Sequence, residues 1–453
     1  MAQECIQQAR SNGVCVQEKA SHANVITKLR KSCVYPAQPS DQKYCDLITF
    51  DLPYVTFHYN QKIMLYPSPS QGFASVVESL QKGLSEALVH FYPLAGRLCM
   101  DEDGILKVDC NGAGVDFIEA SSDVGLADLT DCDSSSDVMQ GLVPYADTLN
   151  LDGFFLPMVG VQVTKLSDGV VIGIAINHLI VDGYSTWHFM SSWAELCRGS
   201  SVICLPPSHD RAVARNTKVK LNIDPPTRDS YVNGTKTEKR PPLRSKIFHF
   251  SKKMMDEIKA AANKNREGKP FSCFQALGAH LWQGVTRARK LAPEDITVFT
   301  LFIDCRTRID PPLPRSYFGN AIQGIYGFTA VGLLLSNGPS FAANMLQQVI
   351  DSHGAKAIKQ KNEEWEKNPK LYGFSDAGMN CVTVGSSPRF EVYENDFGWG
   401  RPVRVRSGCN NKFDGMVYLY PGQEGGGSVD VEIALLPETM DILESDPEFL
   451  LTI

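Results

Sequence analysis

Residues 177–188, NHLIVDGYSTWH, combine a histidine, an aspartate four positions later and a glycine directly after that aspartate. Neutral imidazole is available near neutral pH, because the usual pKa of histidine is about 6.5, so His178 could act as a general base. Asp182 could orient the imidazole or serve as a structural charge partner. Gly183 would permit a sharp turn into a following helix. The pattern alone is loose, since a histidine beside an apolar strand is usually a core residue.

The elements around this segment could hold such a histidine in place. The preceding run GVVIGIAI (169–176) is apolar and β-branched and follows Ser167-Asp168-Gly169, which is typical of a buried strand. The run after Gly183, YSTWHFMSSWAELC, predicts a helix. A histidine between the two has a fixed position and can present a ring nitrogen to a cleft. The other eight histidines lack this combination, and no G-x-S-x-G motif accompanies it.

The length of 453 residues predicts two domains or one large bilobed body. Strand-like and helix-like patterns are mixed in both halves, for example in the predicted helix 76–91. Between them, residues 198–245 are rich in proline, serine, asparagine and charge, which is typical of a long connection. We therefore expect an α/β fold with two similar lobes of mixed sheet and helices, joined by a long crossover.

Composition excludes several classes of function. The chain has 44 basic and 51 acidic residues, a formal charge of −7, and no basic stripe for nucleic acid. Its first residues form no apolar signal segment and no run of eighteen apolar residues occurs, so we expect no membrane span and a cytoplasmic location. The 13 cysteines include no C-x-x-C pair, which favours reduced thiols and predicts no metal site.

Two motifs and four shorter blocks together resemble one family. HLIVDGYSTWHFMSSWAE is similar to the HxxxD signature, and DFGWGRP, which begins at Asp396, to the DFGWG signature, of the plant BAHD acyl-CoA-dependent acyltransferases. The supporting blocks occur in family order: YPLAGRL (92–98), FSCFQALGAHLW (271–282), DCRTR (304–308) and YFGN (317–320). The chain is identified as a member. The segment from VTVGSSPRF to VDVEI further resembles the branch of the uncharacterised acetyltransferase-like and cuticular-ridge acyltransferase proteins.

The resemblance implies a chloramphenicol acetyltransferase-like fold with its active site in the channel between two lobes. It also implies that the first residues extend beyond the usual start of the family. We expect the following division: an extension without ordered structure over 1–20, an N-terminal lobe with HxxxD over 21–205, a crossover loop over 206–240, and a C-terminal lobe with DFGWG over 241–453.

The implied reaction moves an acyl group from a CoA thioester to a hydroxyl or amine of a plant specialised metabolite. His178 would be the general base in a ternary complex without a covalent acyl-enzyme. Acyl-CoA would be a co-substrate, no other cofactor would be needed, and the enzyme would be a monomer. Two alternatives remain: a lyase acting on a conjugate, as in a related protein that lacks the histidine, and a non-enzymatic binding module. The presence of His178 counts against the lyase, and the intact His178–Asp182 pair together with the intact DFGWG motif counts against the binding module.

The resemblance also assigns roles to several other residues. Asp182 would point away from the substrates and pair with Arg306 of DCRTR, and it is grouped with His178 as a catalytic candidate. Gly183, Asp396, Gly398 and Trp399 would be structural. An alternative role for Trp399 is an aromatic platform for CoA.

Five further residues are candidates for contacts with the substrates. Ser251, Lys252 and Lys253 precede a predicted helix, where basic side chains and free N–H groups suit a CoA phosphate, although these lysines could simply form a solvated face. Ser386 and Ser387 stand where the hydroxycinnamoyl-shikimate branch brings a tryptophan to the acceptor pocket. We expect CoA to enter beside the two lysines and the acceptor near Ser387.

Overall fold

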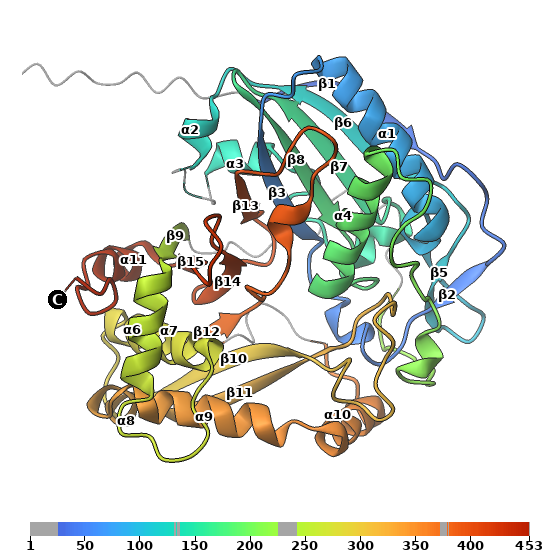
Figure 1. Cartoon of the computed structure of the whole chain (residues 1–453). Helices are drawn as coiled ribbons and strands as arrows, with labels where there is room; N and C mark the ends of the chain where they lie inside the picture. Colours follow the sequence, from blue (N-terminus) through green and yellow to red (C-terminus); the bar gives the residue numbers. More distant parts are fainter. Residues whose placement is uncertain are drawn as a thin grey trace, which may run out of the picture.

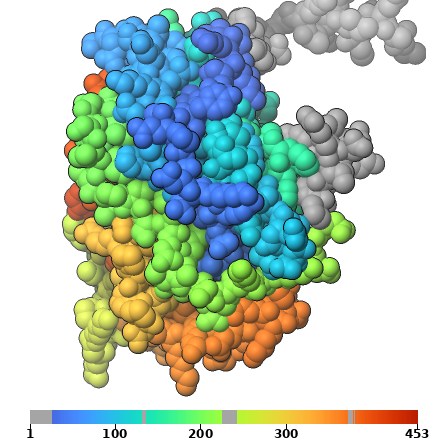
Figure 2. Space-filling model, turned by 90° about the vertical axis from the view of Figure 1, so that its right-hand side faces the viewer, coloured from blue at the N-terminus to red at the C-terminus, as the bar shows by residue number. Residues whose placement is uncertain are grey.

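The computed structural model describes residues 26–130, 133, 136–224, 242–371, 378 and 380–452. The expected extension over 1–20 and part of the expected crossover, 225–240, lie outside these residues. Two six-stranded mixed sheets form the framework of two lobes (Figure 1). Figure 2 shows the blue-to-green N-terminal half above the yellow-to-orange C-terminal half. The predicted two-lobed α/β architecture is confirmed.

The first sheet positions the HxxxD segment. Its strands, in spatial order, are β1 (Thr27–Val34), β6 (Val115–Ser121), β7 (Val159–Lys165), β8 (Gly169–Ile176), β3 (Asn60–Pro67) and β13 (Arg404–Ser407). A small sheet of β2 (Tyr44–Asp46), β5 (Leu106–Asp109) and β4 (Arg97–Met100) shares the same apolar core.

Strand β8 coincides with the strand predicted from the sequence. It is antiparallel to both β7 and β3, and all eight of its residues are buried. Helices α1 (Phe73–His90) and α4 (Gly183–Cys197) cover one face of the sheet, and α2 (Leu126–Thr130) and α3 (Asp137–Gly141) cover the other. Because apolar surface meets both faces, the strand is a continuous apolar run rather than an alternating one.

The second sheet forms the other side of the molecule. Its spatial order is β11 (Ile322–Ala330), β10 (Ile296–Asp304), β12 (Cys381–Val384), β14 (Met416–Pro421), β15 (Val429–Leu435) and β9 (Arg244–Phe250). The helices of this half are α6 (Lys252–Ala262), α7 (Cys273–Ala288), α8 (Val331–Ser336), α9 (Pro339–Ser352), α10 (Ala355–Lys367) and α11 (Pro437–Glu444).

The alternation of side chains along β10 separates core from cavity. Phe299, Leu301 and Ile303 are buried in the apolar core that contains α7 and α9. Their neighbours Thr300 and Phe302 point to the opposite face and line a cavity between the lobes. One strand thus supports the second core and forms a wall of the cavity.

The lobe boundary requires one correction. Strand β13 comes from the C-terminal half of the chain but pairs with β3 of the first sheet, with Arg404 opposite Leu65. The preceding DFGWG segment also packs on the first lobe, where the ring of Phe397 lies 4.8 Å from that of Trp193. The range 241–453 therefore does not form the C-terminal lobe alone. The physical reason is that β3 would otherwise be an edge strand with unpaired backbone groups.

Among the described residues, no helix combines the length and the apolar composition that crossing a bilayer requires.

Candidate active site

The backbone of His178 is held from both lobes just beyond the end of β8. Its N–H donates to Asn150 Oδ1 at 2.8 Å, and its carbonyl accepts from Asn320 Nδ2 at 2.9 Å. Asn177, the residue before it, donates its own N–H to the Met158 carbonyl at 2.9 Å. The imidazole is therefore carried by a backbone segment that has little freedom to move.

The imidazole of His178 lies against Tyr54 and lines the cavity. The two ring centroids are 4.9 Å apart in a stacked arrangement. Nδ1 is buried and has no hydrogen-bond partner among the described residues, while the side chain as a whole is partly exposed. Burial lowers the pKa of His178, and the positive charge of Lys62 lowers it further, against the opposing effect of Asp182. The ring is therefore neutral at neutral pH and able to accept a proton.

The cavity has a volume of about 790 Å³ and lies between the two lobes. Its walls are mainly aromatic and aliphatic, with a few polar groups, as is common for small-molecule sites. Lining residues from the first lobe include Phe50, Tyr54, Phe57, Lys62, His178 and Trp187, and those from the second half include Phe302, Tyr326, Lys361, Trp365, Phe390 and Tyr418. In the described part of the chain, no three His, Cys, Asp or Glu side chains are arranged to hold a metal ion.

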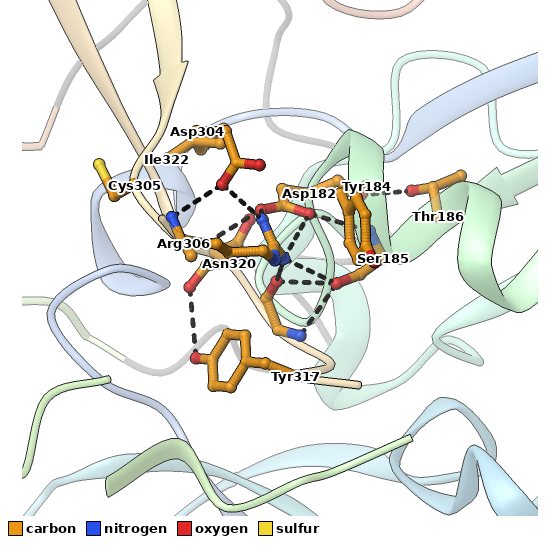
Figure 3. A network of polar contacts seen from close by, with 12 residues as sticks. Asp182, Tyr184, Ser185, Thr186, Asp304, Cys305, Arg306, Tyr317, Asn320 and Ile322 are labelled. Atoms are coloured by element: carbon orange, nitrogen blue, oxygen red, sulfur yellow. Dashed lines mark hydrogen bonds and ion pairs between the residues drawn. The ribbon is translucent and has the colours of Figure 1, made fainter. Parts of the chain in front are cut away.

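Asp182 and Arg306 form the predicted ion pair (Figure 3). Arg306 donates from Nη1 to Asp182 Oδ2 at 2.8 Å and from Nη2 to Oδ1 at 3.0 Å. The carboxylate also accepts backbone N–H groups from Ser185 and Ala321, each at 3.0 Å. Both side chains are buried. The pairing expected from the resemblance is confirmed.

The Asp182 carboxylate stabilises the turn before α4 and does not line the cavity. Burial alone would raise the pKa of Asp182, but Arg306 and the two backbone donors hold it below its usual range. Its bond to the Ser185 N–H caps the N-terminus of α4. Asp182 is absent from the cavity lining. Although the sequence interpretation grouped it with the catalytic residues, its geometry is that of a positioning residue.

Gly183 is needed for a different reason from the one expected. Its φ lies outside the left-handed region, so the turn itself does not require glycine. A Cβ at this position, however, would lie 2.9 Å from ring atoms of Phe390, which lines the cavity. Glycine here makes room for an aromatic side chain of the cavity wall.

The DFGWG segment forms a tight loop away from the cavity. Asp396 Oδ1 accepts from the N–H groups of Gly398 at 2.7 Å and Gly400 at 2.9 Å, and both glycines have positive φ. Trp399 packs near the ring of Tyr66 on β3, with centroids 6.1 Å apart. No residue of this loop lines the cavity. These contacts agree with a structural role and disfavour the alternative in which Trp399 supports CoA.

Comparison with known proteins agrees with this architecture. A family model described as "Transferase family" matches residues 24–450. The chain is 48% identical over 449 residues to BAHD acyltransferase DCR of Arabidopsis thaliana, covering 94% of this chain and 93% of that protein. The chain belongs to the BAHD acyltransferase family. It is accordingly an acyl-CoA-dependent acyltransferase.

Solved structures share the fold of this BAHD acyltransferase. Vinorine synthase superposes with a TM-score of 0.74 at 22% identity, covering 95% of this chain and 98% of that one. The TRI101 protein of F. graminearum, complexed with coenzyme A and T-2 mycotoxin, superposes with a TM-score of 0.69 at 18% identity, covering 90% and 98%. Both carry the two-domain acyltransferase fold.

The CoA candidates of this acyltransferase lie outside the cavity. Ser251 accepts the Met254 N–H at 3.3 Å and caps α6. Lys252 pairs with Asp256, and Lys253 Nζ lies 3.8 Å from Glu257 one turn along the same helix. None of the three lines the cavity. Contact between these residues and CoA stays a prediction.

The two serine candidates differ in position. Ser386 lines the cavity, but its hydroxyl donates to the Leu419 carbonyl and accepts the Leu419 N–H, both at 2.7 Å. Ser387 accepts the Arg389 N–H at 3.3 Å and is absent from the lining. The Ser386 hydroxyl therefore secures the wall to β14, and its part in acceptor recognition stays a prediction.

Sequence reasoning missed a second buried network beside His178. Arg211 Nη1 lies 2.6 Å from Asp51 Oδ1, and its Nη2 donates to the Ile180 carbonyl at 2.9 Å. Asn320 donates to the same Asp51 oxygen at 2.9 Å as well as to the His178 carbonyl. Asn320 ends the YFGN block, but only the fold shows that it contacts the histidine.

Proposed function

We propose that this enzyme transfers an acyl group from acyl-CoA to a hydroxyl or amine of a small plant metabolite, with His178 as the general base. The observation that carries the proposal is the position of the His178 imidazole. The ring is fixed by backbone bonds to both lobes, kept neutral by burial, and partly exposed in the cavity between the lobes.

The proton transfer follows from the state of the ring. Because Nδ1 is buried, Nε2 is the nitrogen that receives the proton from the acceptor hydroxyl or amine. The acceptor oxygen or nitrogen then forms a bond to the thioester carbonyl carbon. The tetrahedral intermediate collapses by breaking the carbon–sulfur bond, and the sulfur leaves with the proton from His178 as free CoA thiol.

A ternary complex without a covalent acyl-enzyme suits the cavity. Its walls come from both lobes and enclose about 790 Å³, so two substrates can lie together beside one imidazole. TRI101 of F. graminearum, which shares the fold, is complexed with both coenzyme A and T-2 mycotoxin. Proximity of the two substrates then supplies much of the rate enhancement.

The test measures free thiol release from a panel of acyl-CoA donors, with and without a plant metabolite extract. Thiol release that depends on the extract, with acylated products found by mass spectrometry, is the expected result. If the extract instead contains a conjugate that is cleaved without any acyl-CoA, the lyase alternative holds.

We also propose that the enzyme works as a cytoplasmic monomer. The cavity and His178 are contributed by a single chain, which supports a monomer. All ten described cysteines are free thiols, which is typical of a reducing compartment. Gel filtration and microscopy of a fluorescent fusion test the two statements separately.

A further inference from the structure

Lys62, a lysine of the cavity wall, forms no ion pair with any acidic side chain that the structure describes. Lys62 lies on β3, is only 4% exposed and lines the cavity. Its Nζ donates to Asn60 Oδ1 at 3.1 Å and lies 5.5 Å from the ring centroid of Tyr418, and both neighbours also line the cavity. No carboxylate among the described residues lies within 4 Å of Nζ. The ammonium group is therefore buried at the cavity wall without an ion-pair partner in the described part of the chain.

The nearby acid is already occupied. Glu432 lies 2.7 Å from Lys412 Nζ, and its two oxygens also accept from the hydroxyl and the N–H of Ser407 at 2.8 and 3.0 Å. These contacts hold the pKa of Glu432 down at about 2, despite burial. Glu432 favours the charged form of Lys62 and Lys412 opposes it. A single carboxylate, already paired with Lys412, therefore faces two ammonium groups, and one positive charge is in excess.

An unpaired buried ammonium is unfavourable for folding. Transfer of a charge from water into an apolar site is strongly unfavourable unless an opposite charge or strong hydrogen-bond acceptors compensate it. Burial lowers the pKa of Lys62 to about 8, which still leaves most of the side chain charged at neutral pH. A single amide oxygen and an aromatic face compensate this charge only in part, so a bound anion would complete the site.

We propose that Lys62 binds a carboxylate of one substrate, carried either by the acyl group or by the acceptor. The apolar remainder of that substrate lies against the aromatic walls, for example Phe57 and Tyr418. This inference rests on the proposed function in one respect, namely that the substrates bind in the cavity that Lys62 lines. It assigns the enzyme a substrate that is both acidic and apolar.

Lys361 is the other lysine of the cavity and offers a matched comparison. It comes from α10 of the second lobe and is partly exposed. Its ammonium donates to the backbone carbonyl of Gly324. Because Lys361 is partly exposed, water can solvate its charge, so we expect Lys361 to contribute less to anion binding than the buried Lys62.

Binding is measured by the fluorescence of Trp187 and Trp365, which line the cavity. The probes are 4-phenylbutanoate and octanoate, each compared with its neutral primary amide. Lys62→Met should weaken binding of both carboxylates about tenfold or more and change binding of the amides less than about threefold. Lys62→Arg should retain most of the carboxylate affinity, and Lys361→Met should leave it unchanged.

Stability gives an independent readout on the same variants. Since Lys62→Met removes an uncompensated buried charge and keeps the apolar stem, its melting temperature should equal or exceed that of the wild type. Lys62→Gln serves as the second neutral variant if the methionine variant fails to fold. Three results would each overturn the proposal. They are an equal loss of affinity for carboxylates and amides in Lys62→Met, a loss of carboxylate affinity only in Lys361→Met, and no carboxylate binding by the wild type.

Turnover separates the two possible sources of the carboxylate. If the acyl group carries the carboxylate, Lys62→Met should lower thiol release with malonyl-CoA more than with acetyl-CoA. If the acceptor carries the carboxylate, the same variant should lower thiol release with hydroxy acids more than with the amides of those acids. Turnover that is equally insensitive to Lys62 in both comparisons contradicts the inference and leaves acyl transfer intact. Conversely, carboxylate binding that depends on Lys62 without any thiol release supports this site and contradicts the proposed function.

Discussion

The carboxylate of Asp182 and the guanidinium of Arg306 join the two lobes through a buried, two-pronged ion pair. Asp182 begins α4 of the first lobe, and Arg306 follows β10 of the second. The pair therefore ties the turn that carries His178 to the strand that forms the opposite cavity wall. This contact therefore holds the turn after His178 against the second lobe.

Asp182→Ala should destabilise the protein strongly. Removing one partner of a buried ion pair leaves the other charge unsolvated and typically costs about 3–5 kcal/mol. The melting temperature in differential scanning fluorimetry should fall by several degrees. Asp304→Ala is the control, because Asp304 lies 3.2 Å from the same guanidinium but is about half exposed, at 51%. A loss of the same size in both variants would contradict the special role of the buried pair.

His178→Ala should fold normally and lose transfer. The substitution removes the proposed base but leaves the cavity walls and the backbone bonds of residue 178 in place. General bases typically contribute about 10²–10⁴-fold, so the variant should retain less than about a tenth of the wild-type rate. His249→Ala is the comparison, because His249 pairs with Asp430 and is absent from the cavity lining. Comparable rates for both variants would argue against the general base.

The acid limb of the pH profile should lie below pH 6.5, the usual pKa of histidine. The pKa of His178 is lowered by burial, and the active form is the neutral imidazole. As the pH falls through this pKa, the ring gains a proton and kcat/KM declines, so a lowered pKa moves the decline to lower pH. The measurement is kcat/KM between pH 4.5 and 8. An acid limb centred above pH 7 would assign the titration to another group.

Gly183→Ala should disturb the cavity wall. The new Cβ would approach the ring of Phe390 to 2.9 Å, so the ring must move. Crowding of this kind typically costs about 1–3 kcal/mol, and KM should change because Phe390 lines the cavity. Phe390→Leu in the Gly183→Ala background should recover much of the stability. If the double variant is no more stable than the single variant, a clash with Phe390 is not the cause.

Some parts of the site were predictable from local pattern. The apolar run 169–176 forms a strand because a fully buried strand needs apolar side chains on both faces, and His178 follows it directly. The predicted helix 76–91 exists as α1, which begins three residues earlier at Phe73, after an N-cap glycine. Such features depend on residues that are neighbours in the chain.

Other parts depend on residues that only the fold brings together. Asn320 reaches the His178 carbonyl across 142 positions, and β13 crosses back to complete the first sheet because β3 has a free edge. A side chain at Gly183 would meet the ring of Phe390, and the excess charge at Lys62 arises because Lys62 and Lys412 face one carboxylate, Glu432. None of these relationships leaves a signal in local composition or spacing.

The sequence by itself determined the family, the reaction class, the strand that carries His178 and the pairing of Asp182 with Arg306 through their motifs. The tertiary structure decided which groups face the cavity, why Gly183 has no side chain, and that Lys62 is buried without an ion-pair partner among the residues that the structure describes. The physical reason is that motif and periodicity record local geometry. Burial, pKa and charge balance instead depend on contacts between distant segments, which exist only once the two lobes have packed together.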